Sequence, residues 1–166
     1  VKMHLMSDEN GDAPINKLND WEGEVVKHEI ARDGALAWYR NPPRQTADSL
    51  GVAYRDETTG NWRSMHPDFI FFHEVDGGAK ASIVDPHGHH LEDSLVKLQA
   101  LAAFADEHGD SFHRIEALSK IGDVMKTLNL KDEGVRAGIK AGGQSVDWFY
   151  NSHFAVNYYA ETAEGS

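Results

Sequence analysis

The chain has no cysteine, which excludes a disulfide framework and any metal site built on thiolates. It has no apolar run that approaches the roughly 18–20 residues of a membrane span. The opening segment Val1–Met6 is too short for a signal peptide. Together these absences predict a cytoplasmic protein without a membrane partner. A length of 166 residues, 40% of them hydrophobic and 26% charged, suits one ordinary globular domain.

Positive charge is also scarce. The chain carries 16 Lys and Arg against 27 Asp and Glu, which gives a formal net charge of −11. Nucleic-acid binding relies on cations that neutralise phosphates, so a domain this acidic is expected to bind DNA poorly by itself. Either the basic residues gather on one face and bind DNA there, or another domain provides the DNA binding. Arg40, Arg44, Arg55 and Arg63 lie close together in the sequence, which is compatible with the first arrangement.

Hydrophobic periodicity and turn residues divide the chain into helices and strands. Helices are expected at 16–33, 91–109 and 131–141, and strands at 35–40, 52–55, 61–64, 67–73, 79–85, 113–118 and 124–130. The aromatic segment 146–159 fits a helix better than a strand. Residues 1–14 are expected to be flexible and 161–166 frayed, which leaves a single domain over 15–160. This order predicts an α/β fold (α+β, with a mixed sheet) and helices on both faces of the sheet.

Two of these strands each carry an aspartate at the edge of the apolar part. Asp68 precedes Phe69-Ile70-Phe71-Phe72, and Asp85 follows Ile83-Val84. The turn Val75–Gly78 lies between the strands and predicts an antiparallel hairpin that brings both carboxylates together. Closely spaced carboxylates are what a hard divalent cation needs. The pair therefore indicates metal-dependent cleavage of a phosphodiester.

Five short motifs follow one another along the chain. They are Trp21-Glu22, Trp38-Tyr39-Arg40-Asn41, Gly51-Val52-Ala53-Tyr54, Pro67-Asp68-Phe69 and Val84-Asp85-Pro86-His87-Gly88. In this order and spacing they resemble the C-terminal nuclease domain of type III restriction enzyme subunits and related helicase-linked defence proteins, within the PD-(D/E)xK nuclease superfamily. The resemblance spans about residues 15–120. It implies a restriction-endonuclease-like fold with a four- to five-stranded mixed sheet flanked by helices.

The resemblance also implies roles for single residues. Family members hold one or two Mg²⁺ ions between a glutamate of the first helix, the aspartate of Pro-Asp and the acidic residue of the next strand. Carried over, these ligands are Glu22, Asp68 and Asp85, with Mn²⁺ as an alternative ion. The family's lysine, which positions or activates the attacking water, is replaced here by His87. Lys97 falls near a basic position that is common in the family.

The replacement by His87 leaves two alternatives open. An imidazole with an ordinary pKa near ~6.5 is only partly charged at neutral pH, yet it can orient or deprotonate a water molecule. Pro86 also removes the backbone N–H between Asp85 and His87. One alternative is a metal-dependent DNA endonuclease, fused to a helicase or translocase that supplies the grip on DNA. The other is a catalytically inactive nuclease-like module that binds partners within such a complex.

Less specific interpretations compete with these roles. Taken alone, Glu22 and Lys97 fit solvent-exposed positions on helices. His87, His89 and His90 fit a separate zinc site in a small hydrolase, since alternate histidines of a strand share one face. The neighbouring proline and glycine indicate a loop rather than a strand, so this third function is the least favoured.

Overall fold

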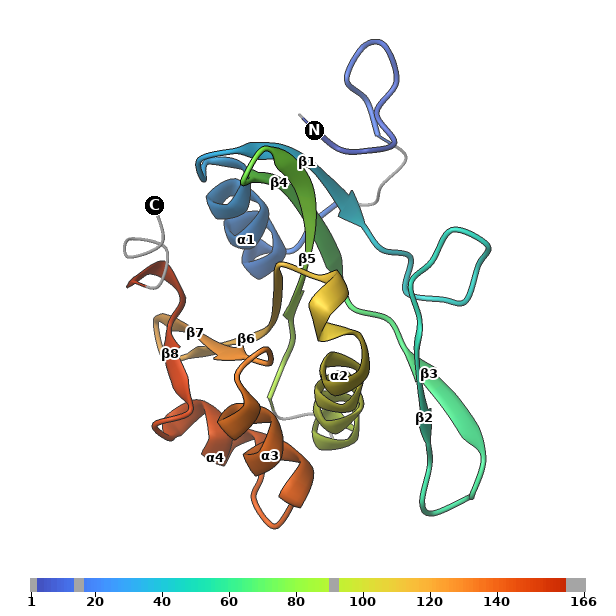
Figure 1. The fold of residues 1–166 in the computed structure, drawn as a ribbon, viewed down its shortest axis with the longest axis vertical. Helices are drawn as coiled ribbons and strands as arrows, with labels where there is room; N and C mark the ends of the chain where they lie inside the picture. Colours follow the sequence, from blue (N-terminus) through green and yellow to red (C-terminus); the bar gives the residue numbers. More distant parts are fainter. Residues whose placement is uncertain (1–2, 14–16, 90–92, 161–166) are drawn as a thin grey trace.

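The computed structural model describes residues 3–13, 17–89 and 93–160 (Figure 1). Its helices are α1 (Asp20–Ile30), α2 (Ser94–His108), α3 (Glu133–Ala141) and α4 (Val146–Asn151), with a 3₁₀ turn at Gly109–Ser111. Its strands are β1 (Ala35–Arg40), β2 (Val52–Arg55), β3 (Trp62–Met65), β4 (Phe69–Val75), β5 (Gly78–Pro86), β6 (Arg114–Ile121), β7 (Val124–Asn129) and β8 (Ala155–Asn157). None of the helices in these ranges is long and apolar enough to cross a membrane.

The expected mixed sheet with flanking helices is confirmed, but the sheet is larger than expected. Its strands run in the order β1-β4-β5-β6-β7-β8. Strands β5 and β6 are parallel and are connected through α2, whereas the other neighbouring pairs are antiparallel. Strands β2 and β3 pair with each other in a separate ribbon. The expectation of four to five strands was wrong, because this sheet has six.

The sixth strand comes from the aromatic segment for which a helix was favoured. Helix α4 ends at Asn151, and Ser152 adopts an extended backbone with φ −90° and ψ 176°. The chain then continues as β8, which pairs with β7 at the sheet edge. The helix prediction for 146–159 was therefore right for α4 and wrong for β8, since the edge of β7 offers hydrogen-bonding groups that sequence periodicity does not reveal.

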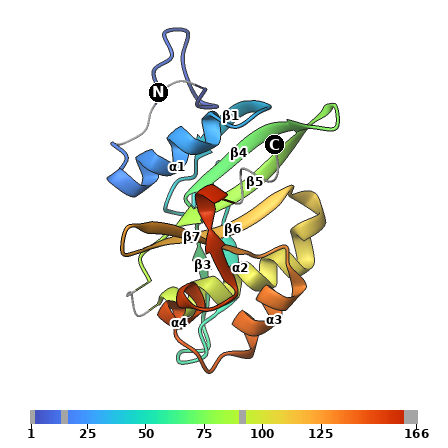
Figure 2. The same cartoon turned by 90° about the vertical axis from the view of Figure 1, so that its left-hand side faces the viewer.

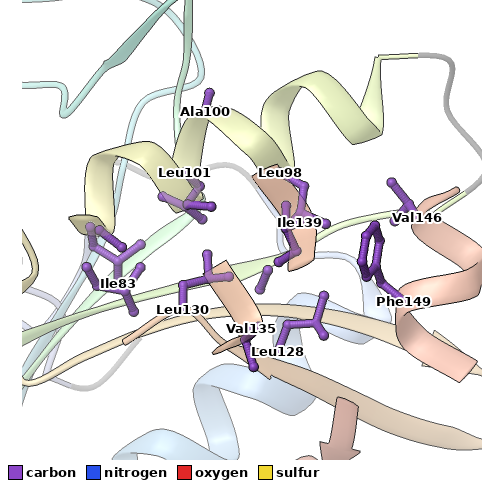
Figure 3. Close-up of a cluster of buried hydrophobic side chains, with 14 of the residues drawn as sticks. Ile83, Leu98, Ala100, Leu101, Leu128, Leu130, Val135, Ile139, Val146 and Phe149 are labelled. Carbon is purple, nitrogen blue, oxygen red and sulfur yellow. The ribbon is translucent and has the colours of Figure 1, made fainter. Parts of the chain in front are cut away.

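Two hydrophobic clusters, one on each face of the sheet, hold the layers together. Because side chains alternate along β5, Ile83 belongs to the cluster with α2, and its neighbour Val84 belongs to the cluster with α1. Figures 1 and 2 show α1 apart from the other three helices. Figure 3 shows the larger cluster, in which side chains of α2, α3 and α4 converge on β5 and β7.

The hairpin between β4 and β5 has the predicted turn and register. Asp76 and Gly77 both have positive φ, 51° and 79°, as a tight two-residue hairpin turn requires. Phe69 lies opposite Val84, so the residues just outside this pair, Asp68 and Asp85, come together at the far end of the hairpin. The turn chemistry thus sets which acidic groups meet.

A buried ion-pair network connects α1 to the sheet. Arg114 of β6 donates hydrogen bonds to both carboxylate oxygens of Glu29, at 2.9 and 2.8 Å, and it also pairs with Glu116. The Tyr158 hydroxyl donates to the same Glu29 carboxylate. Burial alone would raise the pKa of Glu29, but the hydrogen bonds and charge of Arg114 outweigh it and lower this pKa to about 2. The carboxylate is therefore ionised and joins three separate parts of the fold.

Candidate functional site

Four residues singled out by the sequence line one pocket of about 240 Å³. Asp68 lies just before β4, Asp85 near the end of β5, His87 directly after β5, and Lys97 in the first turn of α2. The wall opposite includes His66, which follows β3. Strand ends and a helix start thus meet at one corner of the molecule, where these polar side chains can act on the same ligand.

The two aspartates lie against each other, as the hairpin predicts. The backbone N–H of Asp68 donates a 2.9 Å hydrogen bond to the Asp85 carboxylate. Asp85 is buried and Asp68 is half-buried. Burial and the negative charge of Asp68 raise the pKa of Asp85, and burial together with Glu22 raises the pKa of Asp68 despite the opposing charge of Arg40. Neighbouring carboxylates whose pKa values are raised are often found at functional sites.

Glu22 does not line this pocket. One of its carboxylate oxygens accepts a 2.9 Å hydrogen bond from the Asn19 backbone, in a capping box that begins α1. Its other oxygen lies 2.8 Å from the Arg40 guanidinium, which is in turn 3.6 Å from the Asp68 carboxylate. The predicted third ligand is thus joined to Asp68 through Arg40, and its role as a direct ligand stays a prediction.

Lys97 is held at the pocket by its own helix. Its ammonium lies 2.6 Å from the Asp93 carboxylate one turn earlier. The positive charge of Lys97 acts to lower the pKa of Asp85 and of His87, so it lies close to both. The lysine is therefore placed to bring positive charge to an anion bound in the pocket.

The ring of His87 is fixed by Tyr150 of α4. The His87 Nε2 lies 2.6 Å from the Tyr150 hydroxyl. Burial, with the charges of His89 and Lys97, lowers the pKa of His87 to about 4, so the ring is neutral at pH 7. Burial and Asp85 raise the pKa of Tyr150 well above its usual value, so the phenol keeps its proton. A buried hydroxyl hydrogen needs an acceptor, and we therefore assign Tyr150 as donor to Nε2, which places the imidazole proton on Nδ1.

The histidines after β5 do not gather into a metal site in the part of the chain that the structure describes. His89 bonds through Nδ1 to the Ser119 hydroxyl at 2.7 Å, and its Nε2 lies 3.4 Å from Asp147. His90 lies outside the described residues. Within those residues no group of three or more His, Cys, Asp or Glu side chains is arranged to hold an ion. The hypothesis of a zinc hydrolase gains no support from this geometry.

Comparison with known proteins assigns the chain to a family. The model of the YagJ family matches residues 2–159. The chain belongs to the YagJ family. It is 38% identical over 157 residues to the protein YagJ of Escherichia coli strain K12, a match that covers 95% of this chain and 63% of that protein. The chain thus spans somewhat less than two thirds of the curated relative, and no solved structure matches it.

Membership of the YagJ family carries no activity with it, because neither the family description nor the relative's name states one. The resemblance to PD-(D/E)xK nucleases is not tested by these matches.

Sequence reasoning missed two residues that shape this pocket in the YagJ-family chain. Tyr150 comes from the ambiguous aromatic segment and is far in sequence from His87. Asn41 is buried, and its amide donates to the carbonyls of Leu50 and Pro67, both at 2.8 Å. The Asn41 backbone N–H also donates to the Asp68 carbonyl at 2.9 Å. Asn41 ends the motif Trp38-Tyr39-Arg40-Asn41 and precedes two prolines, which indicates a fixed bend, but neither signal gave its side chain a role.

We expect Asn41→Ala to destabilise the fold and loosen the segment that carries Asp68. The change leaves the buried carbonyl of Pro67 and the partly buried carbonyl and N–H of Leu50, of which the N–H donates to the Asn41 side chain at 2.7 Å, without their partner. The free energy of unfolding should fall by about 1–3 kcal/mol, measured by urea denaturation. Asn61→Ala, at an exposed position before β3, is the matched control and should change it little. If Asn41→Ala lowered the free energy of unfolding no more than Asn61→Ala does, Asn41 would not be what fixes this segment.

Proposed function

We propose that this YagJ-family chain hydrolyses phosphodiester bonds of DNA with the help of a divalent cation. The observation that carries the proposal is the pair of neighbouring carboxylates, Asp68 and Asp85, whose pKa values are raised and which share a pocket with Lys97. A buried carboxylate beside a half-buried one is stabilised when a cation binds between them. The two carboxylates would bind the cation, and the ammonium of Lys97 would bind the phosphate.

The donor set fits Mg²⁺ better than a softer ion. Asp68 and Asp85 offer hard carboxylate oxygens, and Mg²⁺ is usually bound by one or two carboxylates, with water and substrate phosphate in the other positions. Mn²⁺ accepts the same oxygen ligands. When bound there, such an ion polarises the phosphate and lowers the pKa of an attacking water. Glu22 would tune the site through Arg40, or become a third ligand if Arg40 turns to the substrate.

The side chains around the acids supply the remaining roles. Lys97, held by Asp93, would pair with a phosphate oxygen of the substrate. With its proton on Nδ1, His87 would donate a hydrogen bond that orients a water or phosphate oxygen, rather than act as the base. A cation held by Asp85 would lower the pKa of this carboxyl again, so the proton of the attacking water would pass to solvent rather than to Asp85.

The resemblance to PD-(D/E)xK nucleases agrees with this proposal at four positions. Asp68, Asp85 and His87, from the β4–β5 hairpin, and Lys97 of α2 all line the pocket. The finer classification as a restriction-endonuclease-like fold is part of the proposal.

A cleavage assay tests the proposed activity. Supercoiled plasmid and single-stranded circular DNA are incubated with the protein and Mg²⁺ or Mn²⁺. We expect nicking or linearisation that a chelator abolishes and that Asp68→Asn removes. Cleavage that persists in Asp68→Asn would come from a contaminant or another site.

A second function, a catalytically silent module that binds DNA or protein, is favoured by one observation. The Arg40 guanidinium lies between Glu22 and Asp68 and neutralises part of the charge that a cation would use. This alternative predicts no cleavage with either ion, together with partner binding that Asp68→Asn leaves unchanged.

The net negative charge of the chain leads us to propose a partner that binds the DNA. With a net charge of −11, the chain would rely for its grip on DNA on a helicase or translocase in the same or a partner chain, in the cytoplasm. Co-purification with such an ATP-dependent partner, and faster cleavage in its presence, is the expected result.

We expect Tyr150→Phe to remove the preference of the His87 ring for the tautomer with its proton on Nδ1. Removing the hydroxyl takes away the donor to Nε2, so the imidazole proton can move to Nε2 and the two neutral tautomers mix. Nitrogen-15 chemical shifts of the histidine rings measure this change directly. The free energy of unfolding should fall by about 1 kcal/mol. Tyr39→Phe removes a hydroxyl that donates to the Asp48 carbonyl instead, and it should leave the tautomer unchanged. An Nε2–H tautomer already present in the unaltered protein would contradict the assignment.

A further inference from the structure

The β2–β3 ribbon projects from the body of the molecule beside α2 (Figure 1). Its two faces differ. Val52 and Met65 face each other across the ribbon and are buried in the larger core cluster. Arg55 and Trp62 pair on the other face, where Trp62 is 74% exposed. An indole this exposed gains nothing from the core, so it is available to a ligand.

Trp62 forms one wall of a second pocket, of about 470 Å³, between the ribbon and the loop before β2. Gln45, Thr46, Ser49 and Ser64 contribute polar side chains to its lining. The volume lies within the range of roughly 300–1,000 Å³ that small-molecule sites occupy. One aromatic face among hydroxyl and amide groups matches a flat ring that carries both hydrogen-bond donors and acceptors.

This second pocket adjoins the one that holds the two aspartates. Ser64 lines both, and its hydroxyl lies 3.1 Å from Nε2 of His66, which lines the pocket with Asp68 and Asp85. A ligand seated on Trp62 would therefore extend past Ser64 and His66 to the acidic pair. The side chain of Arg63, next to Trp62, lines this second pocket, is 58% exposed and is ion-paired with Asp56 at 3.0 Å.

We propose that the Trp62 pocket binds an unpaired nucleobase of the nucleic acid whose phosphodiester occupies the neighbouring acidic pocket. The inference rests on the proposed phosphodiester chemistry and names its substrate as single-stranded or locally unpaired DNA. Stacking on an aromatic side chain needs a free base face, which a base inside a duplex does not have. The polar lining meets the base edge, and Arg63, which lines the same pocket, would exchange its partner Asp56 for an adjoining phosphate.

Binding is measured by tryptophan fluorescence and anisotropy in the presence of a chelator at fixed low salt, so that no cleavage occurs. The probes are a labelled single-stranded deoxyoligonucleotide, its duplex, and an abasic oligomer with the same phosphates. We expect the single strand to bind more tightly than the duplex and to quench the fluorescence. Trp62→Ala should weaken single-strand binding about tenfold, since stacking on an aromatic side chain is worth ~1–3 kcal/mol per base. Binding of the duplex and of the abasic oligomer should not change.

Two variants serve as controls. Trp62→Phe keeps a ring and should retain most of the affinity while losing most of the quenching. Trp148→Ala removes another exposed tryptophan that lines neither pocket, and it should bind as the unaltered protein does. Equal binding of single strand and duplex, or a Trp62→Ala variant with unchanged affinity, would overturn the inference. Because these measurements need no cleavage, a Trp62-dependent preference for single strands without any nuclease activity would support the base pocket and reject the proposed reaction.

Discussion

Replacing Asp85 with asparagine should lower metal-dependent cleavage more than about 100-fold while making the fold more stable at alkaline pH. Even the loss of an outer partner costs a metal site about 10- to 100-fold, and Asp85 is proposed as a direct ligand. Asparagine keeps the shape and can still accept the Asp68 N–H hydrogen bond. The lost activity would therefore report the missing charge rather than a collapsed pocket.

The gain in stability follows from the direction of the pKa shift. Burial and Asp68 raise the pKa of Asp85 above its unfolded value, so the folded state binds the proton more tightly than the unfolded state does. The stability from this proton is fully present below the unfolded pKa and is lost as pH rises through the folded pKa. Asp85→Asn removes this loss, and the difference in unfolding free energy between variant and original should grow from near pH 4 to pH 8.

Urea denaturation at several pH values measures the effect. Asp123→Asn, in the exposed turn between β6 and β7, changes the same net charge and should alter neither stability nor cleavage. A variant Asp85→Asn that is less stable at pH 8 than the original would mean that this carboxylate is paired with a cation of the protein. The proposed ion site would then have no basis.

The second large effect is expected at Glu29, on the opposite face of the sheet. Glu29→Gln should lower the free energy of unfolding by about 3–5 kcal/mol at pH 7, because removing one partner leaves the Arg114 guanidinium buried with less compensation. Tyr158 also loses its charged acceptor. The nearby Glu24→Gln breaks the partly exposed pairing with Lys120 and should cost less than about 1 kcal/mol.

The pH dependence gives an independent check on Glu29. Its pKa is lowered to about 2, so its contribution to stability is present above the unfolded pKa of 4.5 and is lost as pH falls through about 2. The Glu29→Gln variant should lack this acid-dependent loss. If the variant and the original protein lost stability in parallel on acidification, the carboxylate would not be the centre of the network.

Local sequence signals predicted the parts of the site that depend on neighbouring residues. The turn at Asp76-Gly77 determines the hairpin register, and that register alone brings Asp68 and Asp85 together. Lys97 was singled out by the family resemblance and not by a local signal, and it lines the pocket because α2 starts close to the end of β5. The hairpin register thus follows from turn chemistry, and the place of Lys97 follows from the short connection between β5 and α2.

Contacts between distant segments were not predictable in the same way. Tyr150 and His87 are 63 residues apart, and their hydrogen bond depends on how α4 packs on the sheet. The position of Arg40 between Glu22 and Asp68 likewise depends on the packing of α1 against β1. Strand β8 was missed because an edge strand is stabilised by the groups of β7 rather than by a pattern of its own.

We propose that Asp68 and Asp85 jointly hold a divalent cation. Crystals of the protein soaked in Mn²⁺ and measured at its absorption edge test it most directly, because the anomalous signal locates the ion independently of activity. We expect one anomalous peak in the pocket, from an ion coordinated by an oxygen of each aspartate, and no such peak in Asp85→Asn crystals. A pocket without a peak at a saturating Mn²⁺ concentration, or with Arg40 or Lys97 seated between the two carboxylates, would contradict it.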